Sequence, residues 1–297
     1  MSRLAGMSFR SAAHSLRRRG ALALGQLGEP LSAEPGHFLS PIVGIDDADR
    51  ALRQQPACEG LDLRTAQQVE LVQELANSSH GLPVGPEPGW RYRASPFFAP
   101  GDARVYYAML RHYGPSRVIE VGSGFTSALA LDTRDRFLPD LKLTFIEPYP
   151  ERLHGLLGEA DRDSCEIIEL PVQDVPLDTF DRLDSGDVLF LDTSHVAKAG
   201  SDVNWLMFNV FPRLADGVIV HIHDIFWPFE YPDAWIRDRR SWSEIYLVRS
   251  FLMFNSAFSV MLFNDWMWHH HPELLSALGP GTPGASGSLW LRVNRGA

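Results

Sequence analysis

The segment from Val118 to Asp132, VIEVGSGFTSALALD, constrains the fold of this chain more than any other stretch. It begins with β-branched apolar residues, turns at Gly122, Ser123 and Gly124, and continues with helix-forming residues. This order is typical of a strand, a tight turn and a helix, which together form the repeating unit of an open α/β sheet. The sequence therefore predicts a sheet that contains this strand.

Strand-like and helix-like stretches continue to alternate after this segment. The strand-like runs are RVIEVG, LTFIEP, EIIELPVQ, DVLFLD and GVIVHIHD, and helical stretches begin between them near residues 126, 150, 175 and 202. A final helix over residues 241–255 precedes two more strand runs, FSVMLFND and SLWLRVN. This rhythm predicts an α/β protein with a Rossmann-like, doubly wound and mostly parallel sheet.

The first 80 residues differ from the rest of the chain. Residues 1 to about 40 are rich in Arg, Gly, Ser and Pro, whereas residues 46–75 have a helical pattern. The stretch from Gly81 to Gly89 then alternates glycine and proline, which is typical of a boundary. We therefore expect a partly helical N-terminal extension over 1–80, acting as a lid or a homodimer contact, and a main domain over 81–297.

Composition excludes several classes of protein. The net charge of −10 argues against binding along a nucleic-acid backbone. Cys58 and Cys165 are the only cysteines, so neither a disulfide framework nor a structural zinc site is expected. No apolar run approaches the roughly 18 residues that a membrane span requires. A reducing, cytoplasmic setting is the simplest expectation.

A polar or acidic residue stands at the end of each of the first five predicted strands. Ligands of doubly wound sheets bind beyond the carboxyl ends of the strands, so these residues are the candidate site. In chain order they are Glu120 with its glycine turn, Glu147, Asp174, Asp192, and the pair His223 and Asp224.

The turn favours one cofactor over another. A dinucleotide motif would have an apolar residue where Glu120 stands and a third glycine where Ser127 stands. A carboxylate repels a pyrophosphate but attracts a sulfonium and an ammonium, so the pattern favours S-adenosylmethionine. Glu147 is placed to bind the ribose hydroxyls and Asp174 the adenine amino group. The predicted cofactor-binding residues are Glu120, Gly122, Ser123, Gly124, Thr126, Ser127, Glu147, Asp174 and Asp192.

Four segments together resemble class I S-adenosylmethionine-dependent methyltransferases. They are IEVGSGFTS, FIEPYPERL, DVLFLDTSHVAKAGSDVNW and GVIVHIHDIFWPFEYP. The last two resemble the branch whose fourth and fifth strands end in Asp-x-x-His and His-Asp. The resemblance runs from about Gly101 to the C-terminus. It implies a seven-stranded sheet with an antiparallel last strand, and methyl transfer to an acceptor, most simply O-methylation of a hydroxylated small molecule or glycan.

Asp192 and Asp224 are expected to end neighbouring strands, and this raises the question of a metal. Two carboxylates about 5 Å apart repel by roughly 3 kcal/mol at an effective dielectric of 20. Related catechol- and sugar-type O-methyltransferases place magnesium here, so the resemblance implies Mg²⁺ at Asp192 and Asp224. His223 departs from that pattern, because it stands near where a further oxygen ligand would be expected, and we take it as the third candidate ligand. The alternative is a histidine base at His195, whose ordinary pKa suits proton transfer near neutrality. The predicted catalytic residues are His195, Asp192 and His223.

Other functions remain open at this stage. An NAD-dependent oxidoreductase would use the same sheet, although Glu120 and Ser127 disfavour it. A non-catalytic S-adenosyl-binding scaffold would keep the strand-end acids without turnover. His195 and His223 could also serve only to orient a carboxylate.

Overall fold

The computed structural model describes residues 33–54, 58–93, 95, 97–280 and 286–296. The basic arginine-rich start of the chain lies outside these residues. Two compact units are distinguished, and each is described by itself. The smaller comprises Met1–Arg53 with Ile236–Ser241 and contains helix α2 (Ile45–Ala51). The larger comprises Gln54–Trp235 with Trp242–Ala297 and contains the sheet.

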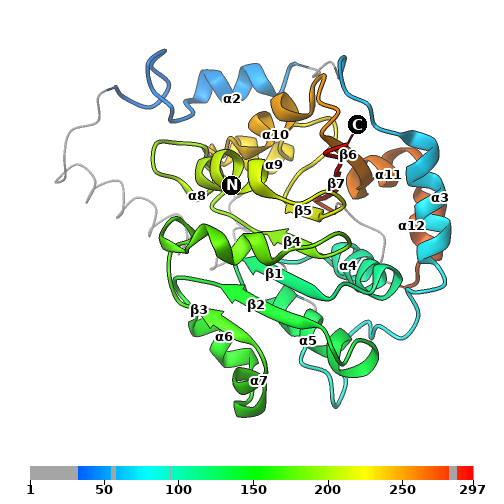
Figure 1. Cartoon of the computed structure of the whole chain (residues 1–297). Coiled ribbons are helices and arrows are strands. Elements are labelled where there is room, and N and C mark those ends of the chain that lie inside the picture. Colours follow the sequence, from blue (N-terminus) through cyan, green and yellow to red (C-terminus); the bar gives the residue numbers. More distant parts are fainter. Residues whose placement is uncertain (1–32, 55–57, 94, 96, 281–285, 297) are drawn as a thin grey trace, which may run out of the picture. The chain divides into compact units, whose positions relative to one another are not determined.

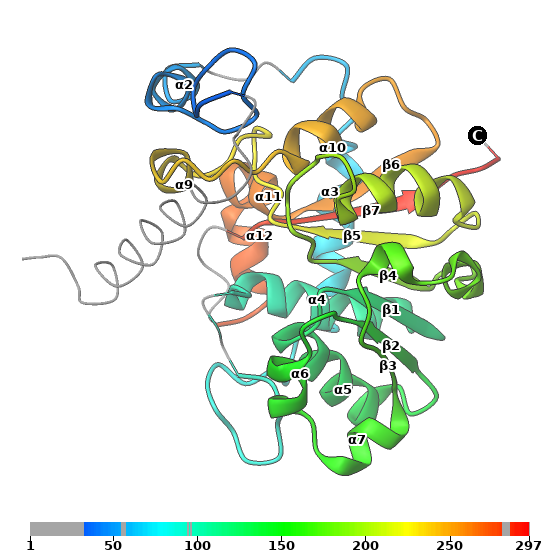
Figure 2. The ribbon, with the colours of Figure 1, turned by 90° about the vertical axis from the view of Figure 1, so that its left-hand side faces the viewer.

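The larger unit is built on a seven-stranded sheet in the order β3-β2-β1-β4-β5-β7-β6 (Figure 1). Strand β7 comes last in the chain but lies between β5 and β6, antiparallel to both (Figure 2). The other neighbouring pairs are parallel, which confirms the predicted fold class. The strands are β1 (Arg117–Val121), β2 (Lys142–Ile146), β3 (Glu166–Ile168), β4 (Val188–Leu191), β5 (Ile219–His223), β6 (Phe258–Phe263) and β7 (Ser288–Val293).

Register brings the carboxyl ends of the central strands together. Val121, the last residue of β1, pairs with Ile146 on β2 and with Leu191 on β4. Leu191 in turn pairs with Ile222 on β5. Residues that directly follow these positions therefore emerge side by side at one edge of the sheet, although they come from distant parts of the sequence.

Helices cover the sheet. Helix α3 (Thr65–Leu75) packs on α4 (Pro100–Tyr113), which packs on α5 (Phe125–Phe137), a series that runs along one side of the sheet in Figure 1. In the described parts of the chain, no helix is both long and apolar enough to cross a membrane. The other α-helices are α6 (Glu151–Leu156), α7 (Glu159–Ser164), α8 (Asp202–Trp205), α9 (Asp233–Arg237), α10 (Glu244–Leu252), α11 (Asn264–His270) and α12 (Pro272–Ala277). Short 3-10 turns lie at Val172–Asp174, Leu177–Arg182 and Phe211–Arg213, and a π turn at Leu206–Val210.

The helical pattern over residues 46–75 forms two separate helices, α2 and α3. Gly60 and Arg64 have positive φ values of 80° and 49°, and these left-handed residues interrupt the helical path. Helix α3 packs against β6 and belongs to the larger unit. A lid or dimer role for the N-terminal extension stays a prediction.

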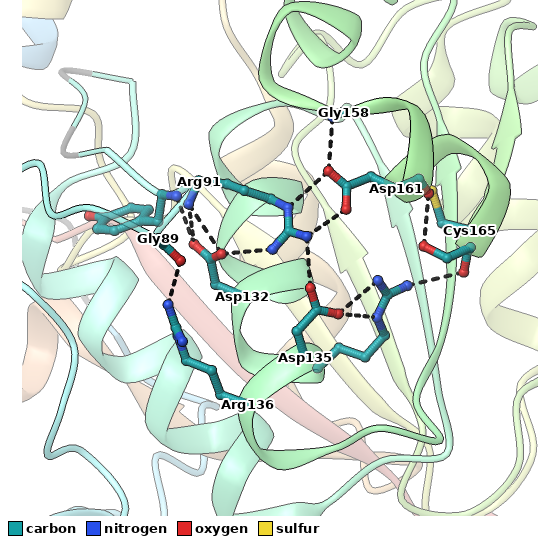
Figure 3. A network of polar contacts seen from close by, with 11 residues as sticks. Gly89, Arg91, Asp132, Asp135, Arg136, Gly158, Asp161 and Cys165 are labelled. Atoms are coloured by element: carbon teal, nitrogen blue, oxygen red, sulfur yellow. Dashed lines mark hydrogen bonds and ion pairs between the residues drawn. The ribbon is translucent and has the colours of Figure 1, made fainter.

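Arg91 anchors the chain that follows the glycine-proline stretch (Figure 3). Its guanidinium contacts Asp132 and Asp135 of α5, at 2.9 and 2.7 Å, and Asp161 of α7, at 2.5 Å. The backbone amides of Arg91 and Tyr92 also donate to Asp132. Since Asp132 and Asp161 are largely buried, one side chain neutralises carboxylates that are mostly shielded from water.

Candidate active site

The glycine turn is pressed against the end of β4. Gly122 has a φ of +84°, and a Cβ added there would lie 1.8 Å from the carbonyl oxygen of Asp192. The amide of Asp192 donates to the carbonyl of Val121 at 2.9 Å. Only glycine fits such an approach, so the turn fixes where the Asp192 backbone emerges.

Protein oxygens occupy all three amides of this turn. The Gly122 amide donates to the carbonyl of Ile146 at 3.0 Å. The Ser123 amide donates to Glu147 Oε2 at 3.1 Å, and the Gly124 amide to Ser127 Oγ at 2.9 Å. These groups are therefore not free to hold the pyrophosphate of a dinucleotide, which weakens the case for NAD.

Glu120 lies fully buried beneath the turn. Its Oε1 accepts hydrogen bonds of 2.6 Å from the hydroxyls of both Thr126 and Ser127. Its Oε2 is buried with no hydrogen-bond partner among the described residues. Burial raises the pKa of Glu120 to about 8, and the two hydroxyl bonds only partly offset it. The orphaned oxygen can therefore accept a donor or a cation that enters from the turn.

A cavity of about 180 Å³ opens above the turn. Six of the predicted cofactor-binding residues line it: Gly122, Ser123, Gly124, Thr126, Glu147 and Asp192. Phe97, Phe98, Phe125, Arg152 and Thr193 complete its walls. Asp174 is exposed on the 3-10 turn after β3 and is not among the lining residues. The structure thus gathers the ends of β1, β2 and β4 around one space.

His195 lies between the two aspartates that follow β4 and β5. Its Nε2 is 3.5 Å from Asp192 Oδ1 and 3.5 Å from Asp224 Oδ2. Its Nδ1 lies 2.9 Å from Glu244 Oε2, at the start of α10. One imidazole therefore contacts three carboxylates, and a cation at this point relieves the repulsion between Asp192 and Asp224.

These contacts control the protonation of the cluster. Burial alone would lower the pKa of His195, but hydrogen bonds to Asp192 and Glu244 outweigh it and raise the pKa well above 6.5. Burial alone would raise the pKa of Asp192, but His195 and His223 outweigh it and lower the pKa. Burial raises the pKa of Asp224, against the attraction of His223 and His195. In the free protein the imidazole is therefore the protonated partner near neutral pH.

Backbone strain marks the same place. His195 and Asp224 have positive φ values of 60° and 57°, which residues other than glycine rarely adopt. The backbone amides of Ser243 and Glu244 donate to the carbonyl of His195 at 2.8 and 3.1 Å. The start of α10 therefore clamps the His195 loop, and strain maintained in this way is typical of functional sites.

Glu244 is a site residue that the sequence does not reveal. It is buried and also accepts the hydroxyl of Thr193 at 2.8 Å. Acidic residues are common in the first turn of a helix because they interact favourably with the helix dipole, so the presence of Glu244 there does not by itself indicate a functional site. Only the fold brings it to His195, 49 residues earlier in the chain.

The histidines of β5 have different surroundings. His223 Nε2 lies 3.6 Å from Asp224 Oδ1 and 3.4 Å from the carbonyl of Phe97. Burial would lower the pKa of His223, but the charges of Asp224 and Asp192 raise it. His221 stacks on Phe190 and its Nε2 lies 2.9 Å from Ser288 Oγ. Burial lowers the pKa of His221 well below its usual value, as befits a neutral core histidine.

The predicted magnesium site is not supported. Among the described residues, no group of three or more His, Cys, Asp or Glu side chains is arranged to hold a metal ion. The imidazole of His195 occupies the position between Asp192 and Asp224 that the ion was expected to fill. Magnesium requires about six oxygen ligands, whereas this cluster places ring nitrogens of His195 and His223 beside the carboxylates. The donor set therefore does not fit Mg²⁺.

Comparisons with known proteins agree with this architecture. A family model described as a methyltransferase domain matches residues 119–225. An uncharacterized protein of Archaeoglobus fulgidus is 33% identical over 164 residues, which are 50% of this chain and 73% of that protein. Together with the strand order, these matches show that the chain belongs to the class I S-adenosylmethionine-dependent methyltransferase family.

Solved structures resemble the chain more distantly. SAH-bound PaMTH1, a methyltransferase of Podospora anserina, aligns with a TM-score of 0.45 and 17% identity, over 81% of this chain and 98% of that one. The O-methyltransferase TomG of Streptomyces achromogenes, involved in tomaymycin synthesis and solved with SAM, aligns with a TM-score of 0.44 and 18% identity. That alignment covers 84% of this chain and 96% of TomG.

Proposed function

We propose that the cavity above the glycine turn binds S-adenosylmethionine. Two buried groups lack hydrogen-bond partners among the described residues here, Glu120 Oε2 and Ser123 Oγ. Buried polar groups are nearly always paired, so these atoms favour a ligand with donors at this place. Glu120 and Asp192 suit the positive charges of the ammonium and the sulfonium.

Glu147 would hold the ribose. It is half-buried at the end of β2, and burial raises its pKa despite hydrogen bonds from the amides of Tyr149 and Ser123. These amides fix the carboxylate at the wall of the cavity. Asp174 remains our candidate for the adenine amino group.

We further propose that the acceptor atom is a hydroxyl oxygen of a small molecule or glycan. The observation that carries this proposal is the cluster of Asp192, His195 and Asp224 beside the cavity. Its carboxylates can accept hydrogen bonds from the hydroxyls of the acceptor and so orient them. When bound, S-adenosylmethionine supplies the electrophilic methyl group.

His195 is the candidate general base. Glu244 holds its Nδ1, and its Nε2 lies beside Asp192 and Asp224, the two groups that we propose to orient the acceptor hydroxyl, so the ring is fixed next to the proposed place of the acceptor. Because its pKa is raised in the free protein, the neutral form becomes more abundant as the pH rises. His195 also loses its proton more readily when the positive charge of a sulfonium lies in the adjoining cavity. His223 would hold Asp224 in place.

The test combines product analysis with a histidine variant. The full chain is incubated with S-adenosylmethionine and a panel of catechols and sugars, and products are identified by mass spectrometry and NMR. We expect a methyl ether, and His195→Ala should lower turnover by about 10²- to 10⁴-fold with cofactor affinity retained. His154→Ala is the matched control, because His154 pairs with Glu169 at the surface.

Three results would count against this proposal. Transfer of the methyl group to nitrogen or carbon would reject the oxygen acceptor. Full turnover by His195→Ala would reject the base. We expect chelation with EDTA to leave turnover unchanged. Loss of activity in EDTA that magnesium restores would instead support a metal ion bound by the two aspartates.

A further inference from the structure

Arg152 is a cation at the wall of an otherwise acidic cavity. It lies in the first turn of α6, five residues after Glu147. Its guanidinium carbon is 4.8 Å from the ring centre of Phe97 and 5.9 Å from that of Phe125. The two rings are nearly parallel, with an interplanar angle of 11° and centres 6.5 Å apart. Cation–π contacts thus hold the charged group at the cavity without neutralising it.

No carboxylate of the described part of the chain pairs with this guanidinium. Its direct contacts among these residues are the two aromatic rings, and its charge also lowers the pKa of Glu147 and of Asp192, against the effect of their burial. Its stem is close to the glycine turn, since a Cβ added to Gly124 would lie 3.2 Å from Arg152 Cδ. Among the described residues that line the cavity, Arg152 is also the only Lys or Arg. A cation so placed, with no ion pair or hydrogen bond to a described carboxylate, is suited to an anionic group of a ligand.

The proposed cofactor contains one such group. S-adenosylmethionine carries a sulfonium, an ammonium and a carboxylate, and the acids of the site suit only the first two. The amides of Gly122, Ser123 and Gly124 already donate to protein oxygens, so these three amides are not available to the carboxylate. Burial of an unpaired carboxylate beside Glu147 and Asp192 would be strongly unfavourable.

We propose that Arg152 binds the amino-acid carboxylate of S-adenosylmethionine and thereby selects cofactors that retain this group. This inference rests on the proposed cofactor site. Arg152 is then a specificity-determining residue, and it is not one of the acids at the strand ends. The pairing also offsets like charge, because the carboxylate of the cofactor enters a cavity whose wall already contains two acids.

The experiment compares two ligands that differ in one group. Binding of S-adenosylmethionine and of decarboxylated S-adenosylmethionine to the full chain is measured by calorimetry. Arg152→Met keeps an apolar stem against Phe97 and Phe125 but removes the charge. We expect this substitution to lower the affinity for S-adenosylmethionine by about 10- to 100-fold, because a charge-assisted hydrogen bond is lost. Affinity for the decarboxylated compound should stay unchanged or increase, because the variant removes a repulsive charge.

Arg162→Met is the matched control, since Arg162 donates to the carbonyl of His154 at the surface and does not line the cavity. It should bind both compounds as the original chain does. Equal weakening of both compounds by Arg152→Met would place Arg152 on the nucleoside and overturn the inference. Unchanged affinity for S-adenosylmethionine would assign the carboxylate to other donors and overturn it as well. If the original chain binds neither compound, the proposed cofactor site itself fails.

Discussion

Replacing Arg91 by methionine should destabilise the larger unit by about 2 to 4 kcal/mol. Breaking a buried ion pair by removing one partner typically costs about 3 to 5 kcal/mol. Arg91 is 26% exposed, which reduces that figure, and Asp132 keeps two backbone donors after the substitution. Asp135 is 38% exposed, so its pairing with Arg91 adds little. Most of the loss therefore comes from Asp132 and Asp161.

The effect should depend on pH in a defined direction. The hydrogen bond from Arg91 holds the pKa of Asp161 below its ordinary value, against the opposing effect of burial. A carboxyl group whose pKa is lowered by folding stabilises the native state above its unfolded pKa, which is about 3.9, and loses this contribution as the pH falls. The difference between the original chain and Arg91→Met should therefore be largest near neutral pH and shrink below about pH 4.

Urea denaturation followed by tryptophan fluorescence measures this difference at pH 7 and at pH 3. Arg162→Met is again the control, because Arg162 donates to a backbone carbonyl at the surface and forms no ion pair with any described residue. A loss smaller than about 1 kcal/mol at pH 7, the value typical of exposed pairs, would refute the reasoning. An equal loss at both pH values would show that packing, and not charge pairing, explains the effect.

Two further predictions concern the site. Glu147→Ala should weaken the binding of S-adenosylmethionine by about 1 to 3 kcal/mol, as loss of a charge-assisted hydrogen bond does. The control is Glu151→Ala at an exposed neighbouring position, which should leave binding unchanged. Calorimetry that shows equal affinities for the two variants would contradict the ribose assignment. Glu244→Gln should lower the pKa of His195, because it removes an anion 2.9 Å from Nδ1, so the rise of turnover with pH should move to lower pH. A pH profile that does not move would argue against an electrostatic role for Glu244.

The strands and the turn were determined by the sequence itself. The apolar runs correspond to the seven observed strands, since strand formation follows local side-chain type and flanking breakers. Glu147, Asp192 and Asp224 follow those strands and Glu120 stands one residue before the end of β1, so parallel topology was enough to place them near one edge. The turn at Gly122 could also be predicted, because it depends on residues that are adjacent in the sequence.

Side-chain partners were decided only by the tertiary structure. Charge repulsion between Asp192 and Asp224 implied a counter-charge, but sequence could not say whether a metal or His195 supplies it. The answer depends on the positive φ of His195 and on its clamp to α10, which is 49 residues away in the chain. Such contacts form because packing fixes where distant segments meet, and local patterns do not carry that information.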